Sequence, residues 1–191
     1  DEKLINASQK EKQFVYLGRL IFYKNVEVIL KSFKIVAKQF PDAKLIIAGD
    51  GPHKKSLQQL TNKLDINDNI TFTGYVTTEQ KKKILSESNA LLFPSLIEGF
   101  GLVMLEAFQQ NRPVITSNIP PMSDIIQNGK TGLVVDPHDE NKWADSIIEL
   151  IKNPQMADKM GKQGNQTLQA KYNQKIFYEK VIKMYNTILS N

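Results

Sequence analysis

The sequence predicts an α/β fold: a doubly wound sheet of six parallel strands between two layers of helices, giving three αβα layers. Two observations carry this prediction. Short apolar runs without polar alternation recur along the 191 residues, as is typical of strands that are buried on both faces. Segments with helical periodicity separate these runs, and strands that alternate with helices form parallel sheets through right-handed crossovers.

The predicted strands are the apolar runs at residues 14–17, 45–48, 70–73, 90–93, 114–116 and 133–135. The apolar positions that mark helices between and after them are Val26, Ile29, Leu30, Phe33, Val36 and Phe40; Leu57, Leu60 and Leu64; Ile84 and Leu85; and Trp143, Ile147, Ile148 and Ile151. Pro41 marks the end of the first helix. We expect a further helix over residues 156–170. A terminal helix would carry an apolar stripe of Phe177, Val181, Met184, Tyr185 and Ile188.

Length and composition favour one globular domain. The hydrophobic fraction of 41% argues against disorder, and 191 residues suit a single domain. Residues 1–13 are polar and lysine-rich, so we interpret them as a linker before a domain at residues 14–191. The chain begins with Asp1 rather than Met, and we therefore expect it to be a piece of a longer protein.

Composition also excludes several classes of function. The absence of cysteine removes disulfide scaffolds, thiol nucleophiles and thiolate metal sites. The only histidines are His53 and His138, which excludes a histidine-rich metal site. The net charge is +5, but only Arg19 and Arg112 are arginines, whereas a nucleic-acid partner would reward more of them. We expect no nucleic-acid partner, and peripheral contact of the lysines with an anionic membrane stays open.

No signal-peptide pattern is present, and no apolar run is long enough to span a membrane. We expect a cytoplasmic protein, with the inner face of the membrane as an alternative location.

Candidate ligand-binding residues follow the predicted strands, because ligands of doubly wound sheets bind beyond the carboxyl ends of the strands. After the first strand, Gly18 and Arg19 are followed by Lys24 just before a helix. Helix N-termini favour anions, and an arginine with a nearby lysine can clamp a diphosphate.

The turn after the second strand, Gly49-Asp50-Gly51-Pro52, begins like a dinucleotide-binding fingerprint. Lys54 occupies the third glycine position, however, and such a fingerprint belongs after the first strand. We therefore expect no nicotinamide site.

The loop after the fourth strand carries the strongest signal. It contains the pattern Glu98-x7-Glu106, with Gly-Phe-Gly directly after the first glutamate and a predicted helix start at Leu102. Glycines let a ligand approach the main chain, and the first amides of a helix have no partner within it. On a helix this spacing would put both carboxylates on the same side of a pocket. There they can accept hydrogen bonds from sugar or ribose hydroxyls.

Gly18-Arg19 with Lys24, Gly49-Asp50-Gly51-Pro52, and Glu98-x7-Glu106 around Gly-Phe-Gly together resemble the retaining glycosyltransferases of group 1, also called family 4. The resemblance covers roughly residues 14–191 as the C-terminal, donor-binding, Rossmann-like half of a GT-B fold. It implies a nucleotide-diphosphate sugar as the ligand. The N-terminal acceptor domain, absent from this chain, would be the partner domain. It also implies that neither a metal nor another cofactor is needed.

The resemblance assigns three catalytic residues: Arg19 and Lys24 would hold the donor diphosphate, and Glu98 would face the transferred sugar. Glu106 would bind the ribose. The donor-binding residues implied besides these are Gly18, Gly99, Phe100, Gly101, Leu102 and Val103, the last four through their amides, and Thr71, because the turn from Thr71 to Tyr75 would frame the base.

The segment before the fifth strand departs from the family, which often has glycine there. Here the sequence is Asn111-Arg112-Pro113. Asparagine tolerates the left-handed backbone, so we expect the turn to survive. We also expect Arg112 to lie near the ribose end and to alter nucleotide preference.

The implied reaction transfers a hexose to an acceptor with retention of anomeric configuration, in polysaccharide biosynthesis. Arg19, Lys24 and the amides near Gly101 would stabilise the charge that grows on the leaving diphosphate. Front-face attack and double displacement through Glu98 both stay open. The isolated chain is expected to be inactive.

Three alternative functions remain. They are a non-catalytic nucleotide-sugar-binding module, a GT-B sugar-nucleotide epimerase and a signalling domain of the response-regulator type. The last needs an acidic cluster after the first strand, where this chain has Arg19.

Overall fold

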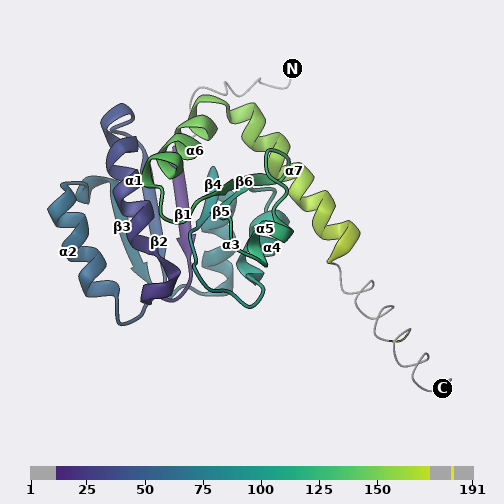
Figure 1. Ribbon diagram of the computed structural model, residues 1–191, viewed down its shortest axis with the longest axis horizontal. Helices are drawn as coiled ribbons and strands as arrows, with labels where there is room; N and C mark the ends of the chain where they lie inside the picture. The colour runs from purple at the N-terminus through teal and green to yellow at the C-terminus, as the bar shows by residue number, and fades with distance from the viewer. Residues whose placement is uncertain (1–11, 173–181, 183–191) are drawn as a thin grey trace.

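The computed structural model describes residues 12–172 and residue 182, and its centre is one parallel sheet (Figure 1). The strands are β1 (Gln13–Leu17), β2 (Lys44–Ala48), β3 (Ile70–Gly74), β4 (Ala90–Phe93), β5 (Val114–Ser117) and β6 (Gly132–Val135). They lie in the order β3-β2-β1-β4-β5-β6, and every neighbouring pair is parallel. The predicted fold class is confirmed.

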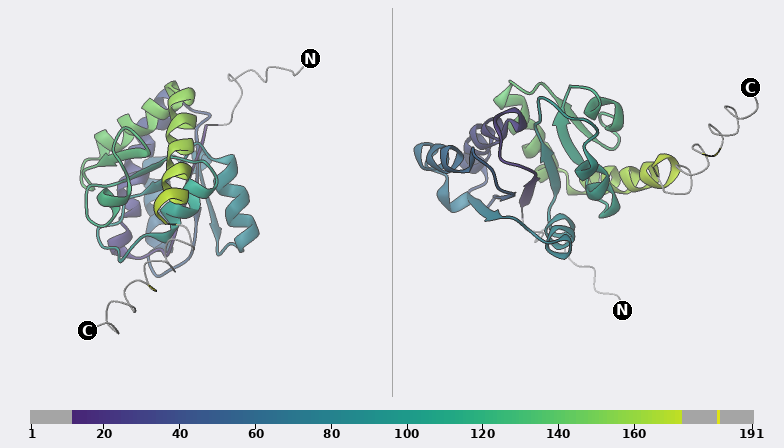
Figure 2. Two further views of the ribbon diagram at one scale, coloured as in Figure 1. Left: turned by 90° about the vertical axis from the view of Figure 1, so that its right-hand side faces the viewer. Right: turned by 90° about the horizontal axis from the view of Figure 1, so that it is seen from below.

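Helices cover both faces of the sheet (Figure 2). Helices α1 (Val26–Gln39), α2 (Lys54–Leu64) and α6 (Glu140–Lys152) contribute to the core on one face. Helices α3 (Thr78–Glu87), α4 (Leu102–Gln109) and α5 (Met122–Ile125) contribute to the core on the other face. The long helix α7 (Pro154–Lys171) contributes to both, with Ala157 and Met160 on the first side and Leu168 on the second.

Strand β1 shows why these apolar runs lack polar alternation. Phe14 and Tyr16 face the core under α1, whereas Val15 and Leu17 face the core under α3 and α4. All four side chains are at most 4% exposed. A strand buried on both faces needs an apolar residue at every position.

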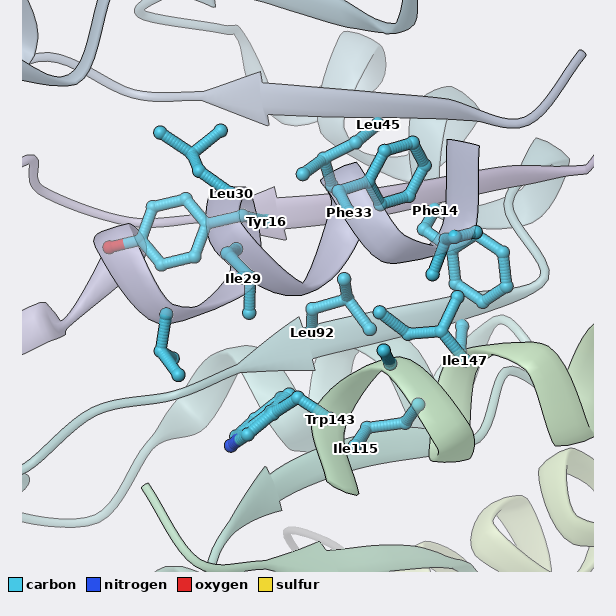
Figure 3. Close-up of a cluster of buried hydrophobic side chains, with 14 of the residues drawn as sticks. Phe14, Tyr16, Ile29, Leu30, Phe33, Leu45, Leu92, Ile115, Trp143 and Ile147 are labelled. Atoms are coloured by element: carbon cyan, nitrogen blue, oxygen red, sulfur yellow. The ribbon is translucent and has the colours of Figure 1, made fainter. Parts of the chain in front are cut away.

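The core beneath α1 and α6 is built around aromatic side chains (Figure 3). Phe14 and Phe33 pack edge to face, with ring centroids 6.4 Å apart. Trp143 is fully buried, and its indole N–H donates to the carbonyl of Asp136 at 3.0 Å. This bond satisfies the one polar atom of a side chain that otherwise fills apolar space.

The structure corrects one expectation, extends a second, adds a helix that was not predicted and leaves one expectation untested. Gln13 belongs to β1 rather than to the predicted linker, because its main chain pairs with β2. Helix α7 begins at Pro154, a residue well suited to a first helical turn. Helix α5 is too short to show helical periodicity. The predicted stripe of Phe177, Val181, Met184, Tyr185 and Ile188 lies outside the described residues.

The loops after β1, β2 and β3 are hydrogen-bonded to one another at the carboxyl edge of the sheet. The amide of Gly18 donates to Ala48, that of Leu20 to Asp50, and that of Gly49 to Gly74. The loops approach so closely that a Cβ on Gly49 would lie 1.9 Å from the carbonyl oxygen of Gly18. Gly49 also has a φ of 148°, which side-chain-bearing residues rarely adopt.

Replacing Gly49 should therefore destabilise the fold. We expect Gly49→Ala to lower the free energy of unfolding by about 2–4 kcal/mol, from backbone strain and overpacking together. Urea titration followed by circular dichroism measures this change. Gly99→Ala is the matched control, since a Cβ there meets no described atom within 4 Å. Equal stability of the two variants would contradict the close-approach explanation.

Candidate functional site

The strand order creates a switch point between β1 and β4, from which the chain winds outward in opposite directions. In doubly wound sheets, the crevice at the carboxyl end of such a point is where ligands bind. The loop after β4 is joined to the loop after β1 across this point. The amide of Leu96 donates to the carbonyl of Tyr23 at 2.8 Å, and the Ser95 hydroxyl, which lies 2.8 Å from the Ile97 carbonyl, is 3.4 Å from the same Tyr23 oxygen.

A cleft of about 420 Å³ opens at this edge of the sheet. Its lining comes from the ends of β1, β2 and β3 and from helices α3 and α4. The lining residues are Leu17, Gly18, Arg19, Ala48, Gly49, Asp50, Tyr75, Val76, Thr78, Lys81, Val103 and Glu106. Four predicted site residues are thus brought together in one cleft: Gly18, Arg19, Val103 and Glu106.

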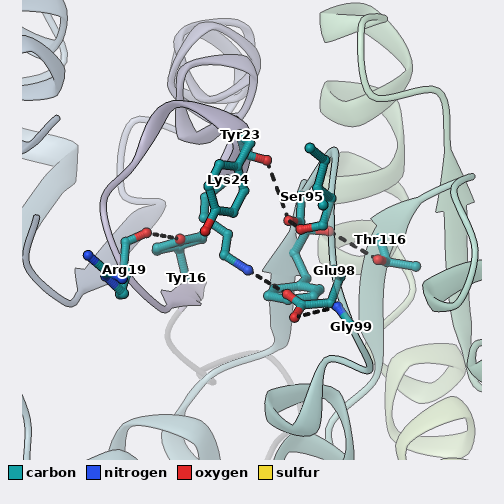
Figure 4. A network of polar contacts seen from close by, with 10 residues as sticks. Tyr16, Arg19, Tyr23, Lys24, Ser95, Glu98, Gly99 and Thr116 are labelled. Carbon is teal, nitrogen blue, oxygen red and sulfur yellow. Dashed lines mark hydrogen bonds and ion pairs between the residues drawn. The ribbon is translucent and has the colours of Figure 1, made fainter.

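Arg19 is exposed at the cleft, and a hydrogen bond holds its main-chain carbonyl in place. The hydroxyl of Tyr16 donates to the carbonyl of Arg19 at 2.8 Å (Figure 4). Burial raises the pKa of Tyr16 well above its ordinary value, and the negative charge of Glu98 adds to this effect. Tyr16 is therefore neutral and remains a hydrogen-bond donor throughout the physiological pH range.

Lys24 and Glu98 form an ion pair that bridges the loops after β1 and β4. The ammonium Nζ of Lys24 lies 2.5 Å from Oε2 of Glu98 (Figure 4). The other carboxylate oxygen of Glu98 accepts from the amide of Gly99 at 3.2 Å. Lys24 also lies 5.5 Å from the centres of the Tyr23 and Phe93 rings, within cation–π range. The side chains of Lys24 and Glu98 are only 14% and 18% exposed, respectively.

Local backbone geometry places Lys24 at the switch point. A short 3₁₀ turn, Phe22–Lys24, ends at Asn25, which has a left-handed backbone with φ of 52°. The side-chain amide of Asn25 donates to the carbonyl of Pro137 at 2.8 Å, which ties the turn to the loop before α6. The next residue, Val26, begins α1.

The two glutamates do not share a helix. Helix α4 begins only at Leu102, because Gly101 adopts a left-handed conformation with φ of 78°. Glu98 therefore lies in the preceding loop, and the expected placement of both carboxylates along one helix side is wrong. Glu106 sits in the second turn of α4 and lines the cleft, where its Oε1 is paired with the ammonium of Lys81.

Close packing at the start of α4 leaves no room for a side chain at Gly101. A Cβ on Gly101 would lie 2.7 Å from Met104 and 3.2 Å from the Phe93 ring. In an α-helix the first amides have no partner within the helix. Leu102 and Val103 supply such amides here. Gly99, Phe100 and Leu102 are exposed beside this turn, outside the lining of the cleft.

Two sequence expectations fall elsewhere in the fold. Thr71 is the second residue of β3, away from its carboxyl end, and the cleft is lined instead by Tyr75 and Val76. Arg112 precedes β5 and so lies at the opposite edge of the sheet. Its guanidinium donates to the carbonyl of Ser86 and lies 3.9 Å from Asp158. The expectation that Arg112 lies near the ribose end is therefore wrong, whereas Asn111 does adopt the left-handed backbone, with φ of 54°.

Sequence reasoning missed several residues of the cleft. Val76 and Thr78 follow β3, so the rule that ligands bind after strand ends could have found them. Asp50 lies in the turn after β2, where its carboxylate pairs with the ammonium of Lys54 at 2.8 Å. Hydrogen bonds from Lys54 and from the amide of Gly51 hold the pKa of Asp50 below its ordinary value. Nothing in the sequence singled out Lys81, because two further lysines follow it directly.

Across residues 12–172 and 182, no group of three or more His, Asp or Glu side chains is arranged to hold a metal ion. In the same part of the chain, no helix combines the length and apolar character that crossing a membrane requires.

Comparison with known proteins agrees with this architecture. Residues 1–167 match the family described as glycosyl transferases group 1. An alpha-D-kanosaminyltransferase of Streptomyces kanamyceticus is 27% identical over 174 residues, which are 91% of this chain and 45% of the relative. The O-antigen chain mannosyltransferase RfbU of Salmonella typhimurium is 33% identical over 150 residues, or 78% of this chain and 41% of the relative.

A solved structure shows the same fold. A mutant of TarM from S. aureus, in complex with fondaparinux, alpha-GlcNAc-glycerol and UDP, superposes with a TM-score of 0.87 at 28% identity. The match covers 93% of this chain and 36% of TarM. The chain thus spans less than half the length of each of these three relatives. Since the family match includes both loops at the switch point, this chain belongs to the group 1 glycosyl transferases and has the fold of one half of a GT-B enzyme.

Proposed function

We propose that this domain binds the nucleotide-diphosphate sugar from which the whole protein transfers a hexose to an acceptor, with retention of anomeric configuration. One observation carries the proposal. Arg19, the amide-bearing start of α4 and the carboxylate of Glu106 converge on a single cleft at the switch point. A cation, free amides and an acceptor-only carboxylate are the groups that a diphosphate and a ribose need.

The relatives support the same ligand class. The TarM structure at 28% identity was solved with UDP, and RfbU is named as a mannosyltransferase. Their sugars differ, so the ligand feature that they can share with this chain is the nucleoside diphosphate.

Catalysis in this proposal rests on stabilising the leaving diphosphate. Negative charge grows on the phosphate oxygens as the sugar takes on oxocarbenium character. In this proposal Arg19, Lys24 and the amides of Leu102 and Val103 offset this charge. Lys24 exchanges its bond with Glu98 for one with a phosphate oxygen, which frees a Glu98 oxygen for the sugar hydroxyls.

We favour front-face attack over double displacement. One carboxylate oxygen of Glu98 accepts from Lys24, and the other accepts from the amide of Gly99, a bond that stays when Lys24 moves to a phosphate. Such a carboxylate is better suited to accept from a sugar hydroxyl than to attack the anomeric carbon. In the front-face route the leaving phosphate takes the proton of the acceptor hydroxyl.

The first prediction concerns diphosphate binding. Arg19→Ala should weaken binding of UDP or GDP by about 1.5–3 kcal/mol, because charge-assisted hydrogen bonds are lost. EDTA should leave the affinity of the unsubstituted chain unchanged. Isothermal titration calorimetry measures both effects. Lys63→Ala, at the far end of α2, removes the same charge and serves as the control. Loss of all binding on chelation would refute metal-independent binding.

The second prediction separates the two glutamates. Glu106→Gln should weaken binding of the bare nucleoside diphosphate, because its partner is the ribose. Glu98→Gln should leave that affinity within about threefold while weakening binding of the intact nucleotide sugar. Titrations of both variants with both ligands measure this division. Equal losses in all four titrations would contradict it.

The third prediction concerns activity. We infer that transfer needs a second domain that closes over the donor, excludes water and presents the acceptor. The 191-residue chain should therefore show negligible transfer with labelled donor, while the full-length protein turns over. Turnover by the chain close to that of the whole protein would refute the two-domain proposal. Failure of the full-length protein to transfer or hydrolyse any donor would favour the non-catalytic module.

A further inference from the structure

We propose that Lys81 is a positioning residue that orients Glu106 for the ribose hydroxyls and so sets the preference of the cleft for ribonucleotides. This inference rests on the proposed function and adds to it a residue from another element. Lys81 belongs to α3 and Glu106 to α4, and both side chains line the same cleft.

The start of α3 is held firmly, which fixes where Lys81 stands. The hydroxyl of Thr77 accepts from the amide of Gln80 at 3.2 Å, and the side chain of Gln80 accepts from the amide of Thr77 at 2.8 Å. This reciprocal capping box satisfies two amides at the helix start. The amide of Lys81 in turn donates to the carbonyl of Thr77 at 2.9 Å.

Lys81 differs from the lysines that follow it. Its ammonium pairs with Oε1 of Glu106, and the two side chains are 29% and 36% exposed. Lys82 and Lys83 are exposed on α3, and Lys83 lies 4.0 Å from Glu87 of its own helix. Only Lys81 of these three lysines lines the cleft.

The pairing determines what Glu106 can offer a ligand. An ionised carboxylate only accepts hydrogen bonds, so it recognises hydroxyl groups. Lys81 engages Oε1 and thereby holds the side chain in one orientation, with Oε2 available to a ribose hydroxyl. Without Lys81, Glu106 can take up several rotamers, and ordering it again on binding lowers the affinity for a ribose.

The test compares ligands that differ only in these hydroxyls. The chain is titrated with UDP and 2′,3′-dideoxy-UDP, and with GDP and its dideoxy counterpart, as the wild type and as Lys81→Met, Lys81→Arg and Lys82→Met. We expect the wild type to prefer the ribonucleotide by about tenfold, the worth of one good hydrogen bond to a charged group. Lys81→Met should reduce this preference to below about threefold. Lys81→Arg should restore most of it, and Lys82→Met should leave it unchanged.

Two outcomes would overturn this inference and leave the proposed function intact. One is a full ribonucleotide preference in Lys81→Met, and the other is an equal loss of affinity for both members of a ligand pair. The latter would mark Lys81 as a general charge for the diphosphate. Failure of the wild type to bind any of these nucleotides would overturn the proposed function as well. Thermal unfolding of each variant is followed in parallel, and Lys81→Gln replaces Lys81→Met should the latter unfold early.

Discussion

The pairing of β1 with both β2 and β4 is the constraint on which the rest of the structure depends. Strand β1 is central and its residues 14–17 are buried on both faces, which favours large hydrophobic side chains at these four positions. Because β4 pairs with the side of β1 that is opposite to β2, the chain reverses its direction of winding there. The loops after β1 and β4 are then forced to meet, and Lys24 is brought to Glu98 from 74 positions away.

Main-chain hydrogen bonds join the loops at the carboxyl edge of the sheet on both sides of this point, and on the β4 side an ion pair between side chains adds to them. Main-chain hydrogen bonds join the loops after β1, β2 and β3, and Gly49 permits their close approach. Between β1 and β4 the links are the Tyr23 carbonyl, which accepts from Leu96, and the Lys24–Glu98 pair. A ligand that breaks the Lys24–Glu98 pair can therefore rearrange these side chains without breaking the main-chain hydrogen bonds between the loops after β1, β2 and β3.

The fold could be predicted almost completely from the sequence, and the site only in part. Apolar runs such as residues 90–93 reveal buried strands because burial on both faces leaves no other pattern. The glycine and the cation at the end of the first strand pointed to Gly18 and Arg19 for the same topological reason, and the pattern Glu98-x7-Glu106 pointed to Glu106. The place of Arg112 before a strand already indicates the edge opposite the cleft, whereas its partners Ser86 and Asp158 could not be predicted, because they come from elements far away in the sequence. Lys81 was equally hidden, since only the packing of α3 beside α4 distinguishes it from Lys82.

The pairing of charges around the cleft has a kinetic consequence. Lys24, Lys54 and Lys81 are each matched with a carboxylate, from Glu98, Asp50 and Glu106. Within the described part of the chain, Arg19 is the cleft cation for which no carboxylate partner is found. Paired charges largely cancel beyond a Debye length of about 8–10 Å, so the empty cleft attracts a distant anion only weakly. The rate at which the nucleotide binds is then governed by diffusion and by the exchange of Lys24 from Glu98 to a phosphate oxygen. Added salt should slow the encounter far less than it would at a cleft with several bare cations.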